Sequence, residues 1–344
     1  MSVLDNLPEL TPEEFERAYH DEKPAKKPRL ASYTLKELAA MNVSAPDYLV
    51  YPWLRAGQSA IISAQAGIGK TFLALSIAKI LTTGGTLFDE RWAAPYPQKT
   101  LFLDGEMALT DMLHRAEKFG LTAENNDFHL YNPDVEADGL PVNLFRPDHQ
   151  AALFEEVEHK SIKCVILDNI SSLYLSDKPN NQEAWLPMQS VVLSLRRKGV
   201  ATILIDHQSK GADGSPRGSS AKLDVLHTAI ALRRPDNYSP EDGCRFEIHF
   251  KKARGFFGAR AASFEVRLRG GEWETSEIQA ATSPGRPRST KQQEVFSMFH
   301  EGKSPADVLG LLDLPKASVY RWFSEWQKLS PSTEEGNPLG RQEE

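Results

Sequence analysis

Between residues 48 and 274 the chain alternates short runs of consecutive apolar residues with longer stretches of helix-like periodicity. The apolar runs predict strands at Ser59–Ser63, Thr100–Asp104, Phe128–Tyr131, Lys163–Asp168 and Val200–Asp206. The intervening stretches predict helices at Lys70–Thr83, Ala108–Phe119, His149–His159 and about Gln182–Lys198. Strands joined through helices form a mostly parallel sheet that is buried on both faces, which explains why these strands are continuously apolar. The predicted fold class is therefore α/β.

Beyond Leu226 the helical periodicity gives way to alternation of apolar and polar residues. The stretches HTAIALRR (227–234), CRFEIHFKKAR (244–254) and AASFEVRLR (261–269) predict strands. Because alternation is typical of strands with one solvated face, we expect antiparallel strands that extend one edge of the sheet. Residues 48–278 thus form the predicted core.

Polar segments flank this core. Residues 1–31 combine acids and prolines with few apolar side chains, which predicts a disordered acidic tail. Residues 32–47 predict a linker helix with Thr34 as its N-cap and Glu37 at the capping-box position. Residues 279–289 are rich in Pro, Gly and Ser and predict a linker.

A small all-α domain is predicted at residues 290–329, followed by a disordered tail at 330–344. Its three short helices are expected at Thr290–Phe299, Ser304–Leu312 and Pro315–Gln327. The last two have the spacing of a helix-turn-helix. We expect Val308, Leu311, Leu312, Trp322, Phe323 and Trp326 to form its core.

Composition narrows the class of protein. The 344 residues leave room for about two domains, and 40% hydrophobic with 25% charged residues is ordinary for a globular protein. No apolar run approaches the roughly 18–20 residues that cross a bilayer, and no signal peptide is visible, so we expect no membrane association. Two cysteines are too few for a disulfide framework, which favours a cytoplasmic protein. The net charge of −7 disfavours a broadly basic surface but leaves a local nucleic-acid groove open.

The strongest motif is AQAGIGKT, residues 64–71, between a predicted strand and a predicted helix. This context is that of a phosphate-binding P-loop, whose glycines turn backbone N–H groups toward phosphates at a helix N-terminus. Lys70 would neutralise the β- and γ-phosphates of ATP, and the Thr71 hydroxyl would ligate Mg²⁺. The alternative is an incidental glycine-rich turn, and the motif departs from the usual pattern at Ala64, where glycine is expected. The candidate nucleotide contacts are Ala66, Gly67, Ile68, Gly69, Lys70, Thr71 and Phe72.

Polar residues close three other predicted strands. Asp168 ends one strand and is the candidate for the Mg²⁺-bound water network. Glu106, which follows Asp104 before a helix, is the candidate that activates the attacking water, although it is also placed to complement a helix dipole. Asp104 would share the metal network or turn the chain.

A third strand ends in Asp206-His207-Gln208. Ligands bind at the carboxyl ends of parallel strands, so His207 or Gln208 is a candidate γ-phosphate sensor, with a structural histidine as the alternative. The polar loop 211–220 that follows is either a solvated connection or an element that grips a polymer.

These motifs resemble the RecA-like core of hexameric replicative helicases of the DnaB and plasmid RepA type. The resemblance spans residues 48–268 and rests on AGIGKT, LFLDGEMAL, VILDNISSL, ILIDHQSKG, RGSSAKLDVLHTAIALRR and Lys252-Ala-Arg-Gly255. It implies that Glu106 is the catalytic glutamate and that His207 is the sensor. No large N-terminal helical domain of the DnaB kind is expected in the chain. This compact organisation is closer to that of RepA-like proteins of mobile elements.

The resemblance also implies partners. Lys252 and Arg254 match the pair that reaches the ATP of a neighbouring subunit, so a homo-oligomer, a hexameric ring, is expected. The family holds single-stranded DNA with loops near residues 211–220, which makes Lys210 and Arg217 candidate phosphate contacts.

The C-terminal helices resemble the DNA-binding modules of resolvases and small regulators. Lys316, Ser318, Tyr320 and Arg321 would then lie near the start of a recognition helix that reads double-stranded origin DNA. Protein docking is the alternative, because the module is only mildly basic.

The resulting hypothesis is a ring-forming motor on single-stranded DNA, driven by ATP with Mg²⁺, that serves as the replicative helicase of a plasmid, phage or other mobile element. Two alternatives remain. One is a nucleotide-switched DNA-binding regulator without unwinding activity, and the other is a RecA-like recombination or repair ATPase.

Overall fold

The computed structural model describes residues 30–135, 141–175, 185–208, 221–278, 290–312 and 314–329. The chain divides into two units, Met1–Asp47 and Tyr48–Glu344. The first contains helix α2 (Leu35–Ala40). Thr34 caps it as predicted, since the Thr34 hydroxyl accepts a hydrogen bond from Glu37 N at 3.2 Å and the Glu37 carboxylate accepts one from Thr34 N at 2.7 Å.

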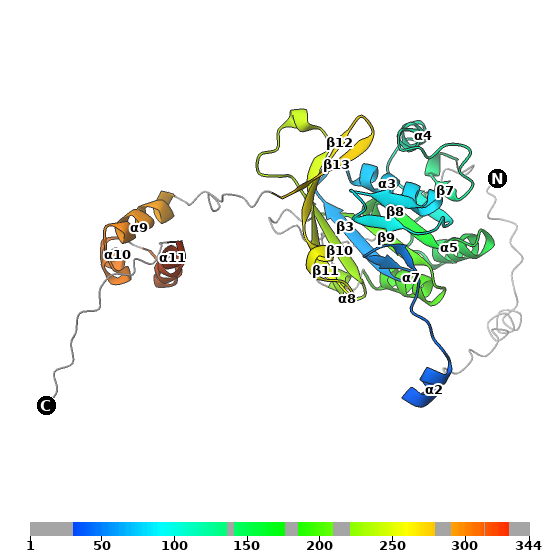
Figure 1. The fold of residues 1–344 in the computed structure, drawn as a ribbon, viewed down its shortest axis with the longest axis horizontal. Coiled ribbons are helices and arrows are strands. Elements are labelled where there is room, and N and C mark those ends of the chain that lie inside the picture. The colour runs from blue at the N-terminus through cyan, green and yellow to red at the C-terminus, as the bar shows by residue number, and fades with distance from the viewer. Residues whose placement is uncertain are drawn as a thin grey trace, which may run out of the picture. The chain divides into compact units, whose positions relative to one another are not determined.

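Within the described part of the second unit, nine strands form one sheet in the order β13-β12-β11-β10-β3-β9-β8-β6-β7 (Figure 1). The predicted parallel strands are β3 (Ser59–Ala64), β6 (Thr100–Asp104), β7 (Phe128–Tyr131), β8 (Cys164–Asp168) and β9 (Ala201–His207). The other four are β10 (Thr228–Arg233), β11 (Arg245–Ala253), β12 (Phe264–Arg269) and β13 (Glu272–Glu277). The predicted α/β class with a mostly parallel sheet is confirmed.

Strand β10 corrects one expectation. The alternation in residues 227–234 predicted an antiparallel strand, but β10 runs parallel to β3 and is buried at five of its six positions. The long connection between β9 and β10 allows a crossover, which a parallel neighbour requires. Antiparallel pairing begins one strand later, at β11, and continues through β12 and β13.

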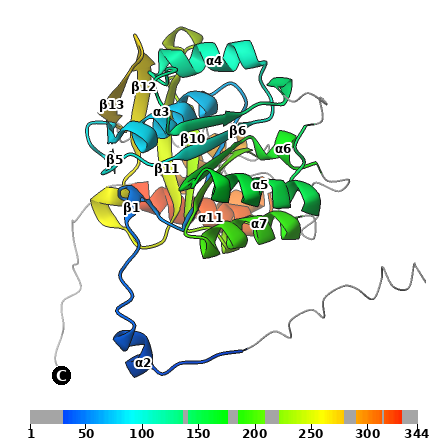
Figure 2. The same ribbon diagram turned by 90° about the vertical axis from the view of Figure 1, so that its right-hand side faces the viewer.

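Helices cover both faces of the sheet (Figure 2). Alternate strand residues such as Ile62 and Phe102 pack with α3 (Lys70–Thr83) and α4 (Leu109–Lys118). Their neighbours in sequence, such as Ile61 and Leu101, lie in a second core with α5 (Pro147–His159), α6 (Ile170–Leu173) and α7 (Leu186–Arg197). The two cores follow from the period of two in a strand, which points neighbouring side chains to opposite faces of the sheet.

Two small hairpins were not predicted. One joins β1 (Tyr48–Val50) to β2 (Leu54–Arg55), and the other joins β4 (Gly85–Leu87) to β5 (Trp92–Ala94). Trp53 and Trp92 pack edge to face, with ring centroids 5.1 Å apart. The shorter elements are the 3-10 helices at Pro133–Val135, Pro240–Asp242 and Gly258–Ala261 and helix α8 (Ala221–Asp224).

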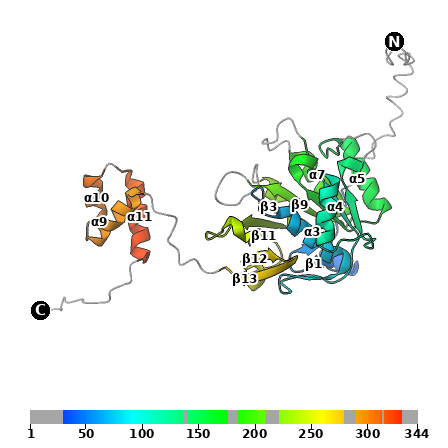
Figure 3. The same cartoon turned by 90° about the horizontal axis from the view of Figure 1, so that it is seen from above.

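The C-terminal helices are α9 (Thr290–His300), α10 (Pro305–Leu311) and α11 (Lys316–Leu329), which pack together in Figure 3. Their core contains Val295, Phe299, Val308 and Val319, with Leu312, Trp322, Phe323 and Trp326 packed against it. Leu311 was expected to face inward but is 59% exposed. Helix α10 ends at Leu311, and the extended residue Leu312 that follows it packs against the core instead.

Across the described residues, no helix is long and apolar enough to cross a membrane.

Candidate nucleotide site

The loop between β3 and α3 has the backbone that a phosphate site needs. Gly67 and Gly69 have φ angles of +72° and +116°, which L-residues rarely adopt. At Gly69 a Cβ atom would also lie 2.4 Å from Cys244 Sγ, so glycine is required there for space as well as for conformation. Gly69 is the N-cap of the 14-residue helix α3, whose free N–H groups favour an anion.

Lys70 lies under this loop with 8% of its surface exposed. Its Nζ donates to the carbonyls of Ala64 at 3.3 Å and Gln65 at 3.0 Å, and it lies 3.3 Å from His207 Nδ1. Burial lowers the pKa of the Lys70 ammonium, against the pull of nearby carboxylates. A cation held by weak neutral acceptors is placed to transfer to phosphate oxygens.

Phe72, a predicted nucleotide contact, has its ring packed within the fold, which leaves its backbone for that contact. The ring packs against Phe119, with centroids 5.7 Å apart, and under Arg115 at 5.2 Å. Ile68 is buried, whereas Ala66 and Gly67 are exposed at the tip of the loop.

Asp168 and Thr71 form the candidate metal site. Asp168 ends β8 and is 5% exposed, and the Thr71 side chain hydrogen-bonds its carboxylate. Burial, with a smaller contribution from Asp104, raises the pKa of Asp168 to about 6. In the described residues no three His, Cys, Asp or Glu side chains are arranged to hold a metal. A hydroxyl and one carboxylate are the donors that Mg²⁺ uses together with nucleotide phosphates, so these residues fit Mg²⁺ with ATP.

Asp104 turns the chain, which is one of the two roles considered for it. Its carboxylate accepts hydrogen bonds from Glu106 N at 3.1 Å and Met107 N at 3.2 Å. The buried Asn132 donates to its second oxygen at 2.9 Å. Burial raises the pKa of Asp104 despite these bonds. The loop that carries Glu106 is therefore fixed at its backbone.

His207 and Gln208 follow different courses at the end of β9. His207 faces the site, between Lys70 Nζ and the Asn169 amide, whose Nδ2 lies 3.4 Å from His207 Nε2. Gln208 instead donates to the carbonyls of Ser63 at 3.3 Å and Leu232 at 3.2 Å. Of the two sensor candidates, the geometry therefore favours His207.

The sheet register explains why these groups meet. Ala64 pairs with His207, and Asp104 pairs with Asp168, so the carboxyl ends of four parallel strands lie along the same side of the sheet. The P-loop, Glu106, Asp168 and His207 are thus brought together as the sequence predicted.

Lys252 and Arg254 lie at the opposite ends of the strands, near the amino ends of β3 and β10. Thr228, the first residue of β10, pairs with Ala60 of β3 on one side and with Ala253 of β11 on the other. The Lys252 ammonium donates to the Leu223 carbonyl, and the Arg254 guanidinium donates to the Asp224 carbonyl at 3.3 Å. They do not join the P-loop cluster of their own chain.

Comparison with known families supports the interpretation of the loop. A family model described as an AAA domain matches residues 24–213, more than half of the chain. The chain belongs to the AAA domain family. Among solved structures it is similar to a KaiC-like protein from the hyperthermophilic archaeon Pyrococcus horikoshii OT3, with 16% identity and a TM-score of 0.47 over 66% of this chain and 93% of that one. No curated protein matches the sequence.

Two residues of this AAA domain protein that hold the P-loop were missed by sequence reasoning. The Arg234 guanidinium donates to the carbonyl of Gly67 at 3.0 Å and to those of Gly243 and Arg245 at 3.0 and 2.9 Å. It also lies 3.8 Å from the Tyr238 ring centroid. Cys244 Sγ lies 3.7 Å from the Ile68 carbonyl. An arginine that directly follows an apolar strand was the available signal, but arginine is common at strand ends.

The DNA-binding candidates are only partly described. Lys210 and Arg217 lie outside the described residues. Lys316, Tyr320 and Arg321 are exposed on the first turns of α11, with Lys316 Nζ 5.8 Å from the Tyr320 ring centroid, and Ser318 is half-buried. Three of these four side chains are available to a partner.

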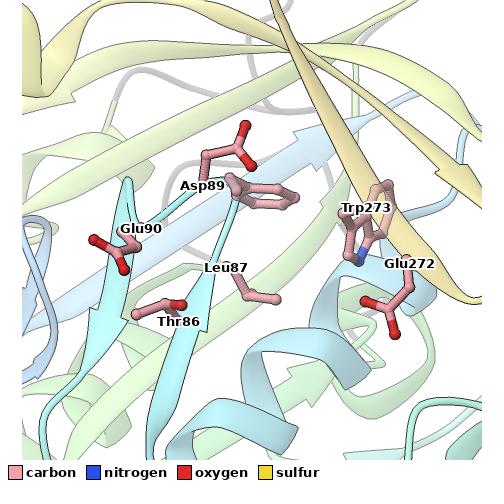
Figure 4. Close-up of a pocket in the computed structure, with 7 residues that line it drawn as sticks. Thr86, Leu87, Asp89, Glu90, Glu272 and Trp273 are labelled. Atoms are coloured by element: carbon pink, nitrogen blue, oxygen red, sulfur yellow. The ribbon is translucent and has the colours of Figure 1, made fainter.

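A pocket of about 530 Å³ lies apart from this site, between the β4–β5 hairpin and β13 (Figure 4). It is lined by Thr86, Leu87, Phe88, Asp89, Glu90, Glu272 and Trp273. None of the predicted site residues is among them.

Proposed function

We propose that this AAA domain protein is an ATPase whose catalytic site is completed by a neighbouring copy and whose hydrolysis drives movement on single-stranded DNA. The observation that carries the proposal is the division of the motif residues between the two ends of the parallel strands. The P-loop cluster gathers at their carboxyl ends, while Lys252 and Arg254 lie near their amino ends.

At the carboxyl ends of the strands each side chain has a distinct role. Lys70 and the backbone of residues 66–72 would bind the phosphates of ATP, and Thr71 and Asp168 would hold Mg²⁺. The ion would screen charge on the phosphate oxygens. Glu106 would take a proton from the attacking water, and His207 would contact the γ-phosphate.

Lys252 and Arg254, near the amino ends of the strands, would act on the nucleotide of a neighbouring copy. Four residue steps separate Ala60 from Ala64 on β3, or about 13 Å at ~3.3 Å per residue. Arg254 would therefore stabilise charge on a neighbour's nucleotide, a contribution worth about 10³–10⁵ in rate for arginine fingers. Because every copy offers one end of its strands and needs the other end of a neighbour's, the contact is head-to-tail. We propose that it closes into a ring of six subunits.

The test of this assignment is turnover by single variants. Arg254→Ala should lose ATP turnover by about 10³-fold or more while retaining ATP binding. Arg269→Ala removes another exposed arginine, from the neighbouring strand β12, and should turn over as wild type does. Equal activity of both variants would contradict a catalytic role for Arg254.

The DNA substrate is tested separately. We propose single-stranded DNA, bound through Lys210 and Arg217, and unwinding of duplexes as a replicative helicase. Single-stranded DNA should stimulate ATP turnover, and the protein should displace a strand from a forked duplex. Stimulation without displacement would contradict the helicase and would favour a nucleotide-switched DNA-binding regulator, which the C-terminal helices also support.

We further propose that α10 and α11 form a helix-turn-helix that binds duplex DNA. Replacing both Lys316 and Arg321 with Ala should weaken duplex binding and reduce its salt dependence, because two phosphate- or base-directed cations are lost. ATP turnover should not change. Unaltered duplex binding would point to a protein partner for this surface.

A further inference from the structure

Asn169 lies within the candidate site, directly after Asp168, and is 2% exposed. It is the N-cap of α6, and its Oδ1 accepts a hydrogen bond from Ser172 N at 3.2 Å. A backbone N–H can only donate, so the atom that faces Ser172 must be the oxygen. The cap therefore fixes the direction of the amide nitrogen.

That nitrogen points into the site. Asn169 Nδ2 donates to Glu106 Oε2 and lies 3.4 Å from His207 Nε2. The carboxylate accepts where the amide must donate, so the two hydrogen bonds of Asn169 agree on one orientation of its amide. Asn169 thus joins β8 to the loop after β6.

Glu106 needs such a partner. Asp104 fixes the backbone of its loop, but the Glu106 side chain is exposed and has three rotatable bonds of its own. An exposed carboxylate samples several rotamers, and a general base acts only when it lies within hydrogen-bond reach of the water. The bond from the buried Asn169 selects one carboxylate position from these.

We propose that Asn169 is a positioning residue that orients the Glu106 carboxylate toward the attacking water. The inference rests on the proposed ATPase function and on the role of Glu106 in it. Asn169 itself touches neither nucleotide nor water in this account; it acts through Glu106.

Two substitutions separate positioning from helix capping. Asn169→Ser retains an N-cap oxygen for Ser172 N, since serine caps about as well as asparagine, but its hydroxyl is too short to reach Glu106. Asn169→Asp keeps the shape and the cap and removes the amide donor. Asn125→Ser is the matched control, because Asn125 also accepts from a backbone N–H, of Asp127 at 3.1 Å, and donates to a side-chain oxygen, of Thr82 at 2.8 Å.

The experiment measures kcat and KM for ATP with the full-length chain. Asn169→Ser should lower kcat about 10- to 100-fold, the size expected from a misplaced catalytic group, with KM changed less than about twofold. Asn169→Asp should lower kcat in the same way, which keeps the test valid if the serine variant fails to fold. Asn125→Ser should leave kcat unchanged.

A double-mutant cycle with Glu106→Asp identifies the route of the effect. The aspartate carboxylate is one methylene shorter and no longer meets Asn169, so adding Asn169→Ser should change the residual single-turnover rate less than about twofold. Equal losses in both backgrounds would mean that Asn169 acts generally on the fold, and would overturn the inference. So would a wild-type kcat in Asn169→Ser, or a Glu106→Asp variant as active as wild type. A wild-type protein without ATP turnover would overturn the proposed function itself and this inference with it.

Discussion

Asp168 combines two demands that conflict. Its carboxyl group is buried at the end of β8, and burial raises its pKa to about 6, whereas binding Mg²⁺ requires the ionised form. The Thr71 hydroxyl and the Lys70 ammonium compensate for only part of the cost of burial. The residue is therefore expected to be placed for function at the expense of stability.

Asp168→Asn should stabilise the protein in the absence of nucleotide and metal. The folded carboxyl keeps its proton to a higher pH than the unfolded one, so the wild type loses stability as the pH rises from about 4 to about 6. At pH 8 the variant should be more stable by about 2–3 kcal/mol, and near pH 4 the difference should vanish. Denaturant unfolding at both pH values measures this, and equal stability at pH 8 would contradict it. ATP turnover should be lost.

The two P-loop glycines should respond differently to substitution. At Gly67 an added Cβ meets nothing within 4 Å, whereas at Gly69 it meets Cys244 Sγ at 2.4 Å and the φ angle of +116° is further from the left-handed minimum. Gly67→Ala should cost about 1 kcal/mol of unfolding free energy and Gly69→Ala about 2–3 kcal/mol. Thermal unfolding without nucleotide compares them. A larger cost at Gly67 would contradict the packing described for Cys244.

The turn between β10 and β11 contacts the P-loop through Arg234. Arg234 joins the Gly67 carbonyl to the carbonyls of Gly243 and Arg245, and the turn is itself held by ion pairs of Asp242 with Arg245 at 2.9 Å and Arg267 at 3.1 Å. The P-loop is thus supported by a strand pair distant in sequence.

Arg234→Ala should weaken ATP binding more than it slows turnover. Three carbonyl groups lose a charged donor, and the Gly67 peptide is free to rotate away from the phosphates. We expect KM for ATP to rise about tenfold with kcat changed less than about threefold. Arg91→Ala, which breaks the exposed pair with Glu277, is the control. An unchanged KM would show that the P-loop holds its shape without Arg234.

Sequence reasoning located most elements because their periods are strong. Helix α3 was predicted with its observed bounds, Lys70–Thr83, and β6 and β7 also matched. The direction of β10 could not be predicted from TAIALR. Its pattern is compatible both with a buried parallel strand and with a half-solvated antiparallel one. The hairpins β1–β2 and β4–β5 are too short to show a period.

The same limit applies to the site. Sequence position was enough to find four site residues: Asp168 and His207 end strands, Glu106 follows a strand, and Lys70 opens a helix. Asn169 and Arg234 act through hydrogen bonds to partners 63 and 167 residues away, and no local pattern records such a distance.

At the scale of the whole molecule, the account depends on the separation of the two ends of the parallel strands. The carboxyl ends carry the residues of the candidate nucleotide site. Lys252 and Arg254 lie near the amino ends, bound to the carbonyls of Leu223 and Asp224. A single copy cannot bring its own arginine to its own phosphate without dismantling β10 and β11. The central claim is that two copies share each catalytic site.

Mixing two inactive proteins tests this claim directly. Lys70→Ala has a broken pocket and an intact Arg254, while Arg254→Ala has an intact pocket, so about one interface in four of an equal, random mixture pairs two intact parts. ATP turnover should return in the mixture, and it should not return when Lys70→Ala is mixed with a Lys70→Ala, Arg254→Ala double variant. Turnover that stays at the level of the separate variants, in a mixture shown to form mixed assemblies, would contradict the shared site.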